Sequence, residues 1–238
     1  MQSDKRHQLL EYGMQGGCEC QFLGSFPPLL VVCPFSKPLG RVLFQSWARW
    51  QLRLFGISVS LQDENPGSDR EGPKLYVWLN QSNLVEGRVI GFLLAPGFVV
   101  INVECALIPL TGFARVCLGD IEINRQWKKQ ARRGITRAAE RLAATAPGII
   151  SIEGARSVDG RLLPYKKGPA VLAIKAQATI IPVVMSGGRD VLPAGTWKVR
   201  PGKIGLHCLT AIPTEGLTYE DREAVVEQLR GIADQGLS

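Results

Sequence analysis

The 238-residue sequence has few histidines and no long apolar run. Its only histidines are His7 and His207. No segment approaches the ~20 consecutive apolar residues that a membrane-spanning helix needs. The nearest candidate, residues 27–34, is short and bounded by prolines. The first residues contain no apolar stretch of the signal-peptide form. We therefore expect a cytoplasmic protein that is soluble or lies peripherally on a membrane.

Cysteine is present, but not in the patterns that are typical of metal sites or disulfide frameworks. The sequence contains no Cys-x-x-Cys pair and no paired histidines. Cys18 and Cys20 form at most half of a metal site. Without a secretory signal, scattered cysteines are expected to be free thiols. His207 lies in the apolar run 204–209, where a histidine packed on a strand face is the ordinary interpretation. We expect no metal and no redox cofactor.

The formal net charge of +7 favours an anionic partner, which could be nucleic acid, a membrane surface or a phosphorylated substrate. Nucleic acid has the least support, because aromatic and basic residues interleave only over 39–55 and no nucleic-acid motif is present. Basic residues also recur at four-residue spacing in a predicted helix at 126–145. Such a face is usually solvated surface, but it can also steer an anionic substrate or a membrane toward the protein. Its members are Lys128, Lys129, Arg132, Arg133, Arg137 and Arg141.

Apolar strand-like runs alternate with helical segments along most of the chain. Strands are predicted at 57–61, 75–79, 98–103, 148–152, 179–185 and 203–210. Helices are predicted at 39–54, 86–94, 126–145, 168–177 and 219–234. The last helix follows a capping signal, Thr218 with Asp221 three residues later. This alternation predicts an α/β fold with a single central sheet, mostly parallel or mixed, flanked by helices.

The predicted helix at 39–54 is amphipathic. Its apolar residues, which include Trp47 and Trp50, recur at three- and four-residue spacing with arginines between them. It either packs on the core or lies at a membrane interface, with tryptophans at headgroup level and arginines toward anionic lipid. The pattern alone leaves both interpretations open.

Four motifs occur in order through the α/β region. They are Asn80-Gln81-Ser82-Asn83-Leu84-Val85-Glu86; Gly119-Asp120-Ile121-Glu122-Ile123-Asn124-Arg125; Ser151-Ile152-Glu153-Gly154-Ala155-Arg156-Ser157 with Tyr165-Lys166-Lys167-Gly168 after it; and Ile180-Ile181-Pro182-Val183-Val184-Met185. The first lies between two apolar runs, which is typical of an active-site motif at the end of a strand, and the third lies on a loop that follows a predicted strand.

Together the motifs resemble the conserved boxes of the glycerolipid acyltransferases, the family that includes lysophosphatidic acid acyltransferase. Those boxes read N-H-x-S-x-x-D, G-x-x-F-I-D-R, F-P-E-G-T-R-S and V-P-V. Their order and spacing match the chain from about Leu39 to Leu217. A single box would be weak evidence, but four in register are specific. The resemblance implies a glycerophosphate acyltransferase-like fold and a role in phospholipid biosynthesis at the cytoplasmic face of a membrane.

The resemblance also implies a set of substrate-binding residues. Arg125 and Arg156 would contact phosphate, since the guanidinium fork suits that geometry; the alternative for both is a surface ion pair. Glu153 would orient the arginines or an acceptor hydroxyl, and Gly154 would let the backbone approach the ligand. The remaining binding candidates are Ser157 and Lys167. Pro182 is expected to shape a loop rather than contact substrate.

The first motif departs from the family at the position of the general base. In the family, the histidine takes a proton from the acceptor hydroxyl, and an aspartate five residues later orients the imidazole. Here Gln81 replaces the histidine and Glu86 replaces the aspartate, while Asn80 is retained. A glutamine amide is not basic near neutral pH. Loss of a general base typically costs ~10²–10⁴ in rate, although positioning alone can still contribute ~7 kcal/mol or more.

Two hypotheses follow. In the first, the protein transfers a fatty acyl group from acyl carrier protein or coenzyme A to a lysophospholipid-like acceptor. Gln81 positions the acceptor, Glu86 acts as base directly or through a water, and Asn80 is the third candidate catalytic residue. In the second, it is a pseudoenzyme that binds acyl lipid or acyl carrier protein at a membrane. In both, residues 1–56 form an N-terminal membrane-associating segment and residues 57–238 an acyltransferase-like α/β domain. No nucleic acid partner is expected.

Overall fold

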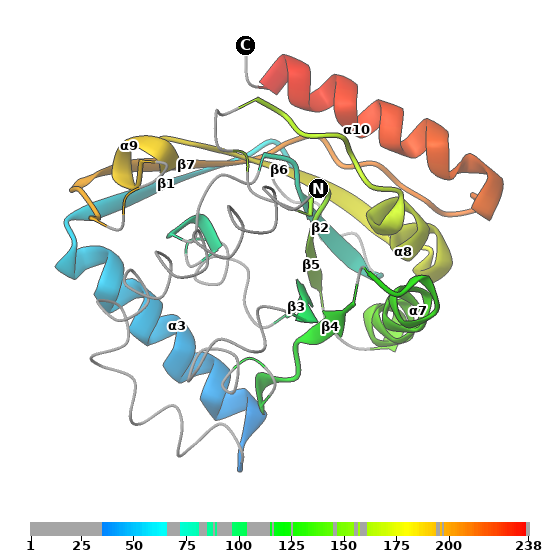
Figure 1. The fold of residues 1–238 in the computed structure, drawn as a ribbon, viewed down its shortest axis with the longest axis horizontal. Helices are drawn as coiled ribbons and strands as arrows, with labels where there is room; N and C mark the ends of the chain where they lie inside the picture. Colours follow the sequence, from blue (N-terminus) through cyan, green and yellow to red (C-terminus); the bar gives the residue numbers. More distant parts are fainter. Residues whose placement is uncertain are drawn as a thin grey trace.

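The computed structural model describes residues 35–65, 72–80, 85–87, 89, 97–103, 115, 117–124, 126–144, 147–154, 157, 161–193, 196 and 198–236. Within this part of the chain, strands form one mixed sheet in the order β1-β7-β6-β2-β5-β3-β4 (Figure 1). The strands are β1 (Ile57–Asp63), β2 (Lys74–Trp78), β3 (Phe98–Asn102), β4 (Ile121–Ile123), β5 (Gly148–Ser151), β6 (Thr179–Ser186) and β7 (Gly202–Cys208). A single mixed sheet flanked by helices confirms the predicted fold class.

The sheet is parallel from β6 to β4, and its other end runs in the opposite direction. β2 pairs in parallel with β6 on one side and with β5 on the other, and β3 pairs in parallel with both β5 and β4. β7 pairs antiparallel to β6 and parallel to β1. The carboxyl ends of β2, β3, β4, β5 and β6 therefore lie along one edge of the sheet.

Helices cover both faces of the sheet. They are α3 (Lys37–Leu54), α7 (Lys128–Ala144), α8 (Gly168–Ala176), α9 (Gly188–Val191), the 3₁₀ turn η1 (Tyr219–Asp221) and α10 (Arg222–Gly236). α7, α8 and α10 pack over one face, where Leu75 and Val77 of β2 point together with Leu79, the residue after the strand. α3 and α9 lie over the other face, where Trp78 of β2 is buried. The alternation along β2 follows from the two-residue period of a strand that is buried on both sides.

The predicted strands and helices agree with the structure to within a few residues at most boundaries. Two elements were not predicted, β4 and α9. The capping signal before the last helix is confirmed, since the Asp221 carboxylate accepts hydrogen bonds from Thr218 N (2.7 Å) and from its hydroxyl (2.9 Å). Of the helix predicted at 86–94, residues 85–87 and 89 are helical and the others lie outside the described residues. The expectation that Pro182 shapes a loop is wrong, because Pro182 is buried within β6 opposite Val77.

Helix α3 uses both of its faces. Trp47, Ala48 and Leu52 are buried, and Leu52 packs in the hydrophobic cluster beneath the sheet. On the solvent side, Trp50 is 50% exposed and Leu54 is 63% exposed. The core-packing interpretation therefore holds for one face, and the other remains available for an apolar contact. No helix in the described ranges is both long and apolar enough to cross a bilayer.

A buried carboxylate lies at the far end of the sheet, close to the point where α3 contacts it. The Asp120 side chain is 8% exposed and lies 3.3 Å from Arg115 Nη1; it also accepts a hydrogen bond from Val99 N (3.0 Å). Arg41 of α3 donates to Leu118 O (2.8 Å), and Arg141 of α7 donates to Gly119 O. Desolvation raises the pKa of Asp120, and the nearby cations oppose that shift. The Gly-Asp pair of the second motif thus has a structural role.

Candidate active site

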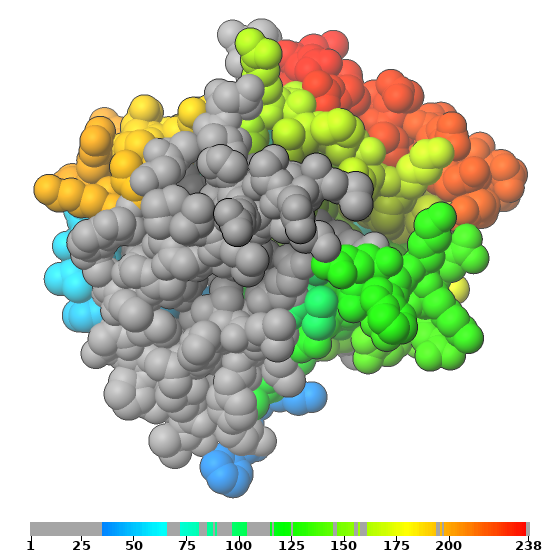
Figure 2. All heavy atoms as spheres, in the orientation of Figure 1, coloured from blue at the N-terminus to red at the C-terminus, as the bar shows by residue number. Residues whose placement is uncertain are grey.

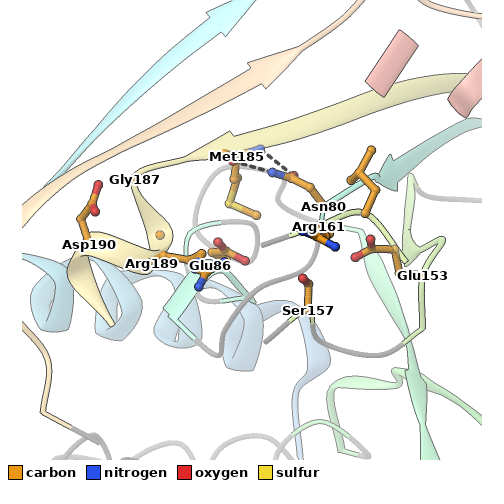
Figure 3. A pocket seen from close by; sticks show the side chains of 11 residues that line it. Asn80, Glu86, Glu153, Ser157, Arg161, Met185, Gly187, Arg189 and Asp190 are labelled. Atoms are coloured by element: carbon orange, nitrogen blue, oxygen red, sulfur yellow. Dashed lines mark hydrogen bonds between the residues drawn. The ribbon is translucent and has the colours of Figure 1, made fainter. Parts of the chain in front are cut away.

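A small cavity opens at the carboxyl edge of the sheet, where β2, β5 and β6 end (Figure 3). Its volume is about 130 Å³, room for several waters or a group the size of glycerol. In α/β sheets, ligands bind outside the carboxyl ends of the strands. We call it the edge cavity. Its lining residues are Asn80, Glu86, Glu153, Ser157, Arg161, Leu162, Met185, Gly187, Gly188, Arg189 and Asp190.

Asn80 joins two of the strands that carry the cavity. Its Nδ2 donates to Met185 O (2.6 Å), and its Oδ1 accepts from Met185 N (2.9 Å) (Figure 3). The side chain thus continues the β2–β6 ladder one step beyond the last backbone pair. Since the nitrogen and the oxygen of its amide are both bonded to Met185, the Asn80 side chain is held in place in the cavity wall.

Glu86 lies in the floor of the cavity, on the helical turn that follows β2. Its side chain is buried, with the residue only 2% exposed. Gly188, the first residue of α9, lies directly against it. A Cβ at Gly188 would overlap the carboxylate, lying 2.7 Å from Glu86 Cδ and 2.9 Å from Cγ. The structure therefore holds Glu86 in a space that exists only because residue 188 is glycine.

Glu153 is the second buried carboxylate of the cavity. It is 2% exposed and accepts a hydrogen bond from Leu163 N (2.6 Å). This bond joins the two ends of the loop that carries the third motif. A second bond across the same loop runs from Lys166 N to Ile152 O (3.0 Å). Gly154 follows with φ +70°, a left-handed conformation that glycine adopts without strain. The chain can therefore turn sharply beside the buried carboxylate.

Tyr165 ties this loop to the end of β2. Its hydroxyl donates to Leu79 O (3.0 Å), and Arg230 of α10 stacks over its ring at 5.0 Å. Burial and the nearby Glu153 carboxylate raise the pKa of Tyr165 above its ordinary value. The phenol therefore stays protonated at neutral pH and keeps its donor role. The loop after β5 is thus braced by both β2 and α10.

The rim of the cavity is exposed and carries two arginines, whereas its floor is buried and carries two carboxylates. Arg161, Arg189 and Asp190 are exposed, whereas Glu86, Glu153 and Ser157 are buried. Two guanidinium groups at the opening can hold an anionic group such as phosphate. A hydroxyl on the same molecule can then reach the carboxylates below. The arrangement suits a small polyol phosphate.

Sequence reasoning missed Arg161, Arg189 and Asp190. None of them belongs to a recognised motif, since Arg161 lies after the third and the others after the fourth. The glycine pair Gly187-Gly188 was the available signal, because such a pair after a strand marks a close approach of the backbone.

The structure brings together some of the predicted site residues and separates one. Asn80, Glu86, Glu153 and Ser157 all line the edge cavity, and Gly154 is adjacent to Glu153. Lys167 is not a lining residue; its ammonium is 2.6 Å from Glu223 of α10. The predicted residues Gln81, Arg125 and Arg156 lie outside the described residues. Among the described residues, no cluster of three His, Cys, Asp or Glu side chains could hold a metal ion.

Comparison with known proteins points to one family. Residues 68–186 match the family model described as Acyltransferase. The chain is 28% identical over 181 residues to a 1-acyl-sn-glycerol-3-phosphate acyltransferase of Limnanthes alba, an alignment that covers 75% of this chain and 63% of that protein. It is 37% identical over 78 residues to the human 1-acyl-sn-glycerol-3-phosphate acyltransferase alpha, covering 33% and 28% of the two chains.

A solved structure has the same fold. The crystal structure of the 1-acyl-sn-glycerophosphate (LPA) acyltransferase PlsC from Thermotoga maritima superposes with a TM-score of 0.73. The match covers 98% of this chain and 96% of that one, at 19% sequence identity. At this identity the likeness concerns the fold. The chain spans about 63% of the length of the first plant relatives that it matches.

Proposed function

Because the chain belongs to the glycerolipid acyltransferase family, we propose that it transfers a fatty acyl group from an acyl thioester to the free hydroxyl of a lysophosphatidic acid-like acceptor. The observation that carries this proposal is the edge cavity, in which buried carboxylates lie below two rim arginines. The acceptor of such a reaction carries a phosphate and a hydroxyl on one glycerol unit. The arginines suit the phosphate, and the carboxylates suit the hydroxyl.

This reaction needs a group that accepts the proton of the acceptor hydroxyl, and Glu86 would be that general base. Its carboxylate takes the hydroxyl proton directly or through a water, and the acceptor oxygen attacks the thioester carbonyl carbon. The new C–O bond forms as the C–S bond breaks. The departing thiolate then takes a proton. Gln81, which lies five residues before Glu86, would hydrogen-bond the acceptor but cannot accept its proton near neutral pH.

A lipid acceptor lies in a membrane, so the protein would bind the membrane surface to reach it. Apolar side chains on the solvent side of α3 would contact lipid, and Arg53 lies on the same side of the helix. Tryptophan and arginine on such a helix suit the headgroup region. The exposed apolar residues of this surface are Phe35, Leu39, Val42, Trp50 and Leu54.

The pseudoenzyme remains a second candidate, and the glutamine at position 81 favours it. In this case the cavity binds acyl lipid or the acyl donor without turnover. Its fold and its binding residues would be unchanged. Only the proton transfer would be missing.

Two variants, compared with native protein, separate the candidates. We expect native protein to convert lysophosphatidic acid and an acyl thioester to product, detected by mass spectrometry. Glu86→Gln, which keeps the size of the side chain, should lower turnover by about 10²–10⁴. Full activity of Glu86→Gln would exclude Glu86 as base. If native protein and Glu86→Gln are both inactive while Gln81→His turns over, the pseudoenzyme is the correct interpretation.

A further inference from the structure

A second hollow runs beside helix α7, separate from the edge cavity. It is an open groove of about 1,020 Å³ between α7 and the carboxyl ends of β3 and β4. Figure 2 shows atoms of α7, coloured green, on the molecular surface. We call it the α7 groove. It is lined by Val103, Glu122, Asn124, Lys128, Lys129, Gln130, Arg132, Arg133, Thr136, Arg137 and Glu140.

The packing of α7 turns its basic side outward. Gly134, Ala138 and Leu142 form the buried stripe of the helix. Gly134 lies so close to the sheet that a Cβ there would be 2.9 Å from Ile123 Cγ1. With this stripe fixed against β4, the residues one position earlier, Arg133 and Arg137, lie at the groove. Lys129 continues the same row one turn toward the N-terminus.

The cations of the groove have no partner within the described part of the protein. Lys128, Lys129, Arg132, Arg133 and Arg137 are all exposed, and none forms a salt bridge or a hydrogen bond with another described residue. Like charges at i,i+4 destabilise a helix. This surface therefore retains a repulsion that an anionic partner would relieve.

Arg141 lies on the same helix as the five groove cations but has a structural role. It was predicted as part of the basic face, but the structure removes it from that face. Its guanidinium lies 4.8 Å from the centre of the Phe98 ring and donates to Gly119 O. The five groove cations make no such contacts, so packing does not explain their presence.

We propose that the α7 groove is the docking surface for an acidic protein that carries the acyl thioester, that is, for acyl carrier protein. This inference rests on the proposed function, since it names the source of the acyl group. Each exposed ion pair contributes little to binding, so a small anion would be held weakly in so open a groove. A partner with several carboxylates along one helix can engage the whole row at once, and such complementarity also speeds its association.

The lining favours a discrete protein over a bilayer. Glu122 and Glu140 lie among the cations, and a uniformly anionic membrane would be repelled by both. A protein partner can place its own cations opposite them, which adds specificity. The surface is also hollow, and among the described residues that line it Val103 alone is apolar. The apolar surface suited to lipid lies on α3 instead.

The location suits delivery to the edge cavity. Asn124 follows β4 and Glu153 follows β5, and the carboxyl ends of these strands lie along the same edge of the sheet. β4 is two strands from β5 and four strands from β6, which separates β4 from the strand ends at the cavity by about 10–20 Å, since neighbouring strands are separated by about 4.8 Å. The flexible phosphopantetheine arm of a carrier docked at α7 can therefore extend its thioester to the cavity.

The test measures carrier binding separately from turnover. The probe is holo-acyl carrier protein without an acyl group, titrated against fluorescently labelled native protein at low and high salt. We expect saturable binding that weakens as salt rises. The double variant R133E/R137E should weaken binding by at least about tenfold, because rim charges set association and specificity. With an acyl carrier protein donor its KM should rise, while its KM for acyl coenzyme A and its kcat should be unchanged.

A charge-matched control is available at the other end of the sheet. Lys198 and Lys203 are exposed, and Lys203 lies on β7. The double variant K198E/K203E changes the net charge by the same amount and should bind the carrier as native protein does. Equal weakening in both double variants would show a net-charge effect and overturn the docking surface.

The outcomes separate this proposal from the proposed function. Turnover of acyl coenzyme A without carrier binding overturns the docking surface and leaves the acyltransferase intact. Carrier binding that R133E/R137E abolishes, with no turnover by native protein, supports the docking surface and favours the pseudoenzyme. If R133E/R137E instead loses binding only to vesicles of phosphatidylcholine and phosphatidylglycerol in equal parts, the groove faces lipid and the carrier proposal is wrong.

Discussion

The edge cavity and the α7 groove lie on the same edge of one sheet, but they are built in opposite ways. The cavity buries two carboxylates, and its walls are fixed by hydrogen bonds between β2, β5 and β6. The groove exposes five cations that no described residue pairs. Buried polar groups are costly unless they are bonded, so a change in the cavity alters stability and chemistry together. Exposed charges contribute little to folding, so a change in the groove should alter partner binding alone.

The largest expected effect comes from Gly188, where the cavity has no spare volume. In Gly188→Val the new side chain would overlap the Glu86 carboxylate. We expect the free energy of unfolding to fall by about 1–3 kcal/mol through overpacking, and activity to be lost because Glu86 is displaced. Urea denaturation and product formation measure the two effects.

Gly231 of α10 is the matched control, since nothing lies within 4 Å of a Cβ there. Gly231→Ala should leave activity unchanged and raise stability by about 0.5–1 kcal/mol. If Gly188→Val retains native stability and activity, Glu86 does not depend on the space that Gly188 leaves.

Asn80 gives the next effect, and Asn65 supplies its counterpart away from the cavity. Both side-chain amides bridge backbone groups: Asn80 through Met185, and Asn65 through Leu209 O (2.9 Å) and Ala211 N (3.0 Å). Leucine at either position should cost about 1–3 kcal/mol of unfolding free energy. Only Asn80→Leu should also weaken acceptor binding, measured by calorimetry. Equal loss of acceptor binding in both variants would show that the cavity responds to general destabilisation.

Glu153 separates the hydrogen-bonding role of a buried carboxylate from its charge. In Glu153→Ala the N–H of Leu163 loses its acceptor, which should cost about 1–2 kcal/mol of unfolding free energy. Glu153→Gln keeps an acceptor oxygen and should preserve most of that stability. If the carboxylate charge is needed by the substrate site, Glu153→Gln should nonetheless raise the KM for the acceptor. A glutamine variant with native kinetics would limit Glu153 to bracing the loop.

The smallest effect on stability is expected in the α7 groove. R133E/R137E should change the free energy of unfolding by no more than about 0.5 kcal/mol, as surface substitutions usually do. Thermal denaturation at low and high salt measures it. A loss comparable to that of Asn80→Leu would remove the contrast between the two sites, because it would show that the groove cations help to hold α7 on the sheet.

Elements with a long and regular pattern could be predicted from the sequence, whereas short ones could not. The 17-residue helix α7 and the eight-residue strand β6 were recognisable from their apolar periodicity. β4 has only three residues and α9 only four, which is too short for a period to show. Both owe their conformation to neighbours, since β4 pairs with β3 and α9 packs against β7.

The residues of the site also fall into those that the sequence predicted and those that it did not. Asn80, Glu86, Glu153 and Ser157 were predicted because they belong to motifs, and they do meet in the edge cavity. Arg161 and Arg189 reach the same cavity from segments that carry no motif. Arg141 fitted the basic face by spacing, but the structure commits it to Phe98 and Gly119. Helical spacing predicts which residues share a face of a helix. It does not predict which other parts of the protein each of those residues contacts.

The sequence by itself determined the family, the alternation of strands and helices, and the presence of a glutamine at position 81 in the first motif. These are properties of residue type and order along the chain. Only the tertiary structure decided that Gly188 leaves the space for Glu86, that Asn80 is bonded to Met185, and that the five groove cations of α7 have no partner among the described residues. Each depends on segments far apart in the chain meeting at one edge of the sheet, and close packing sets those distances rather than any local pattern.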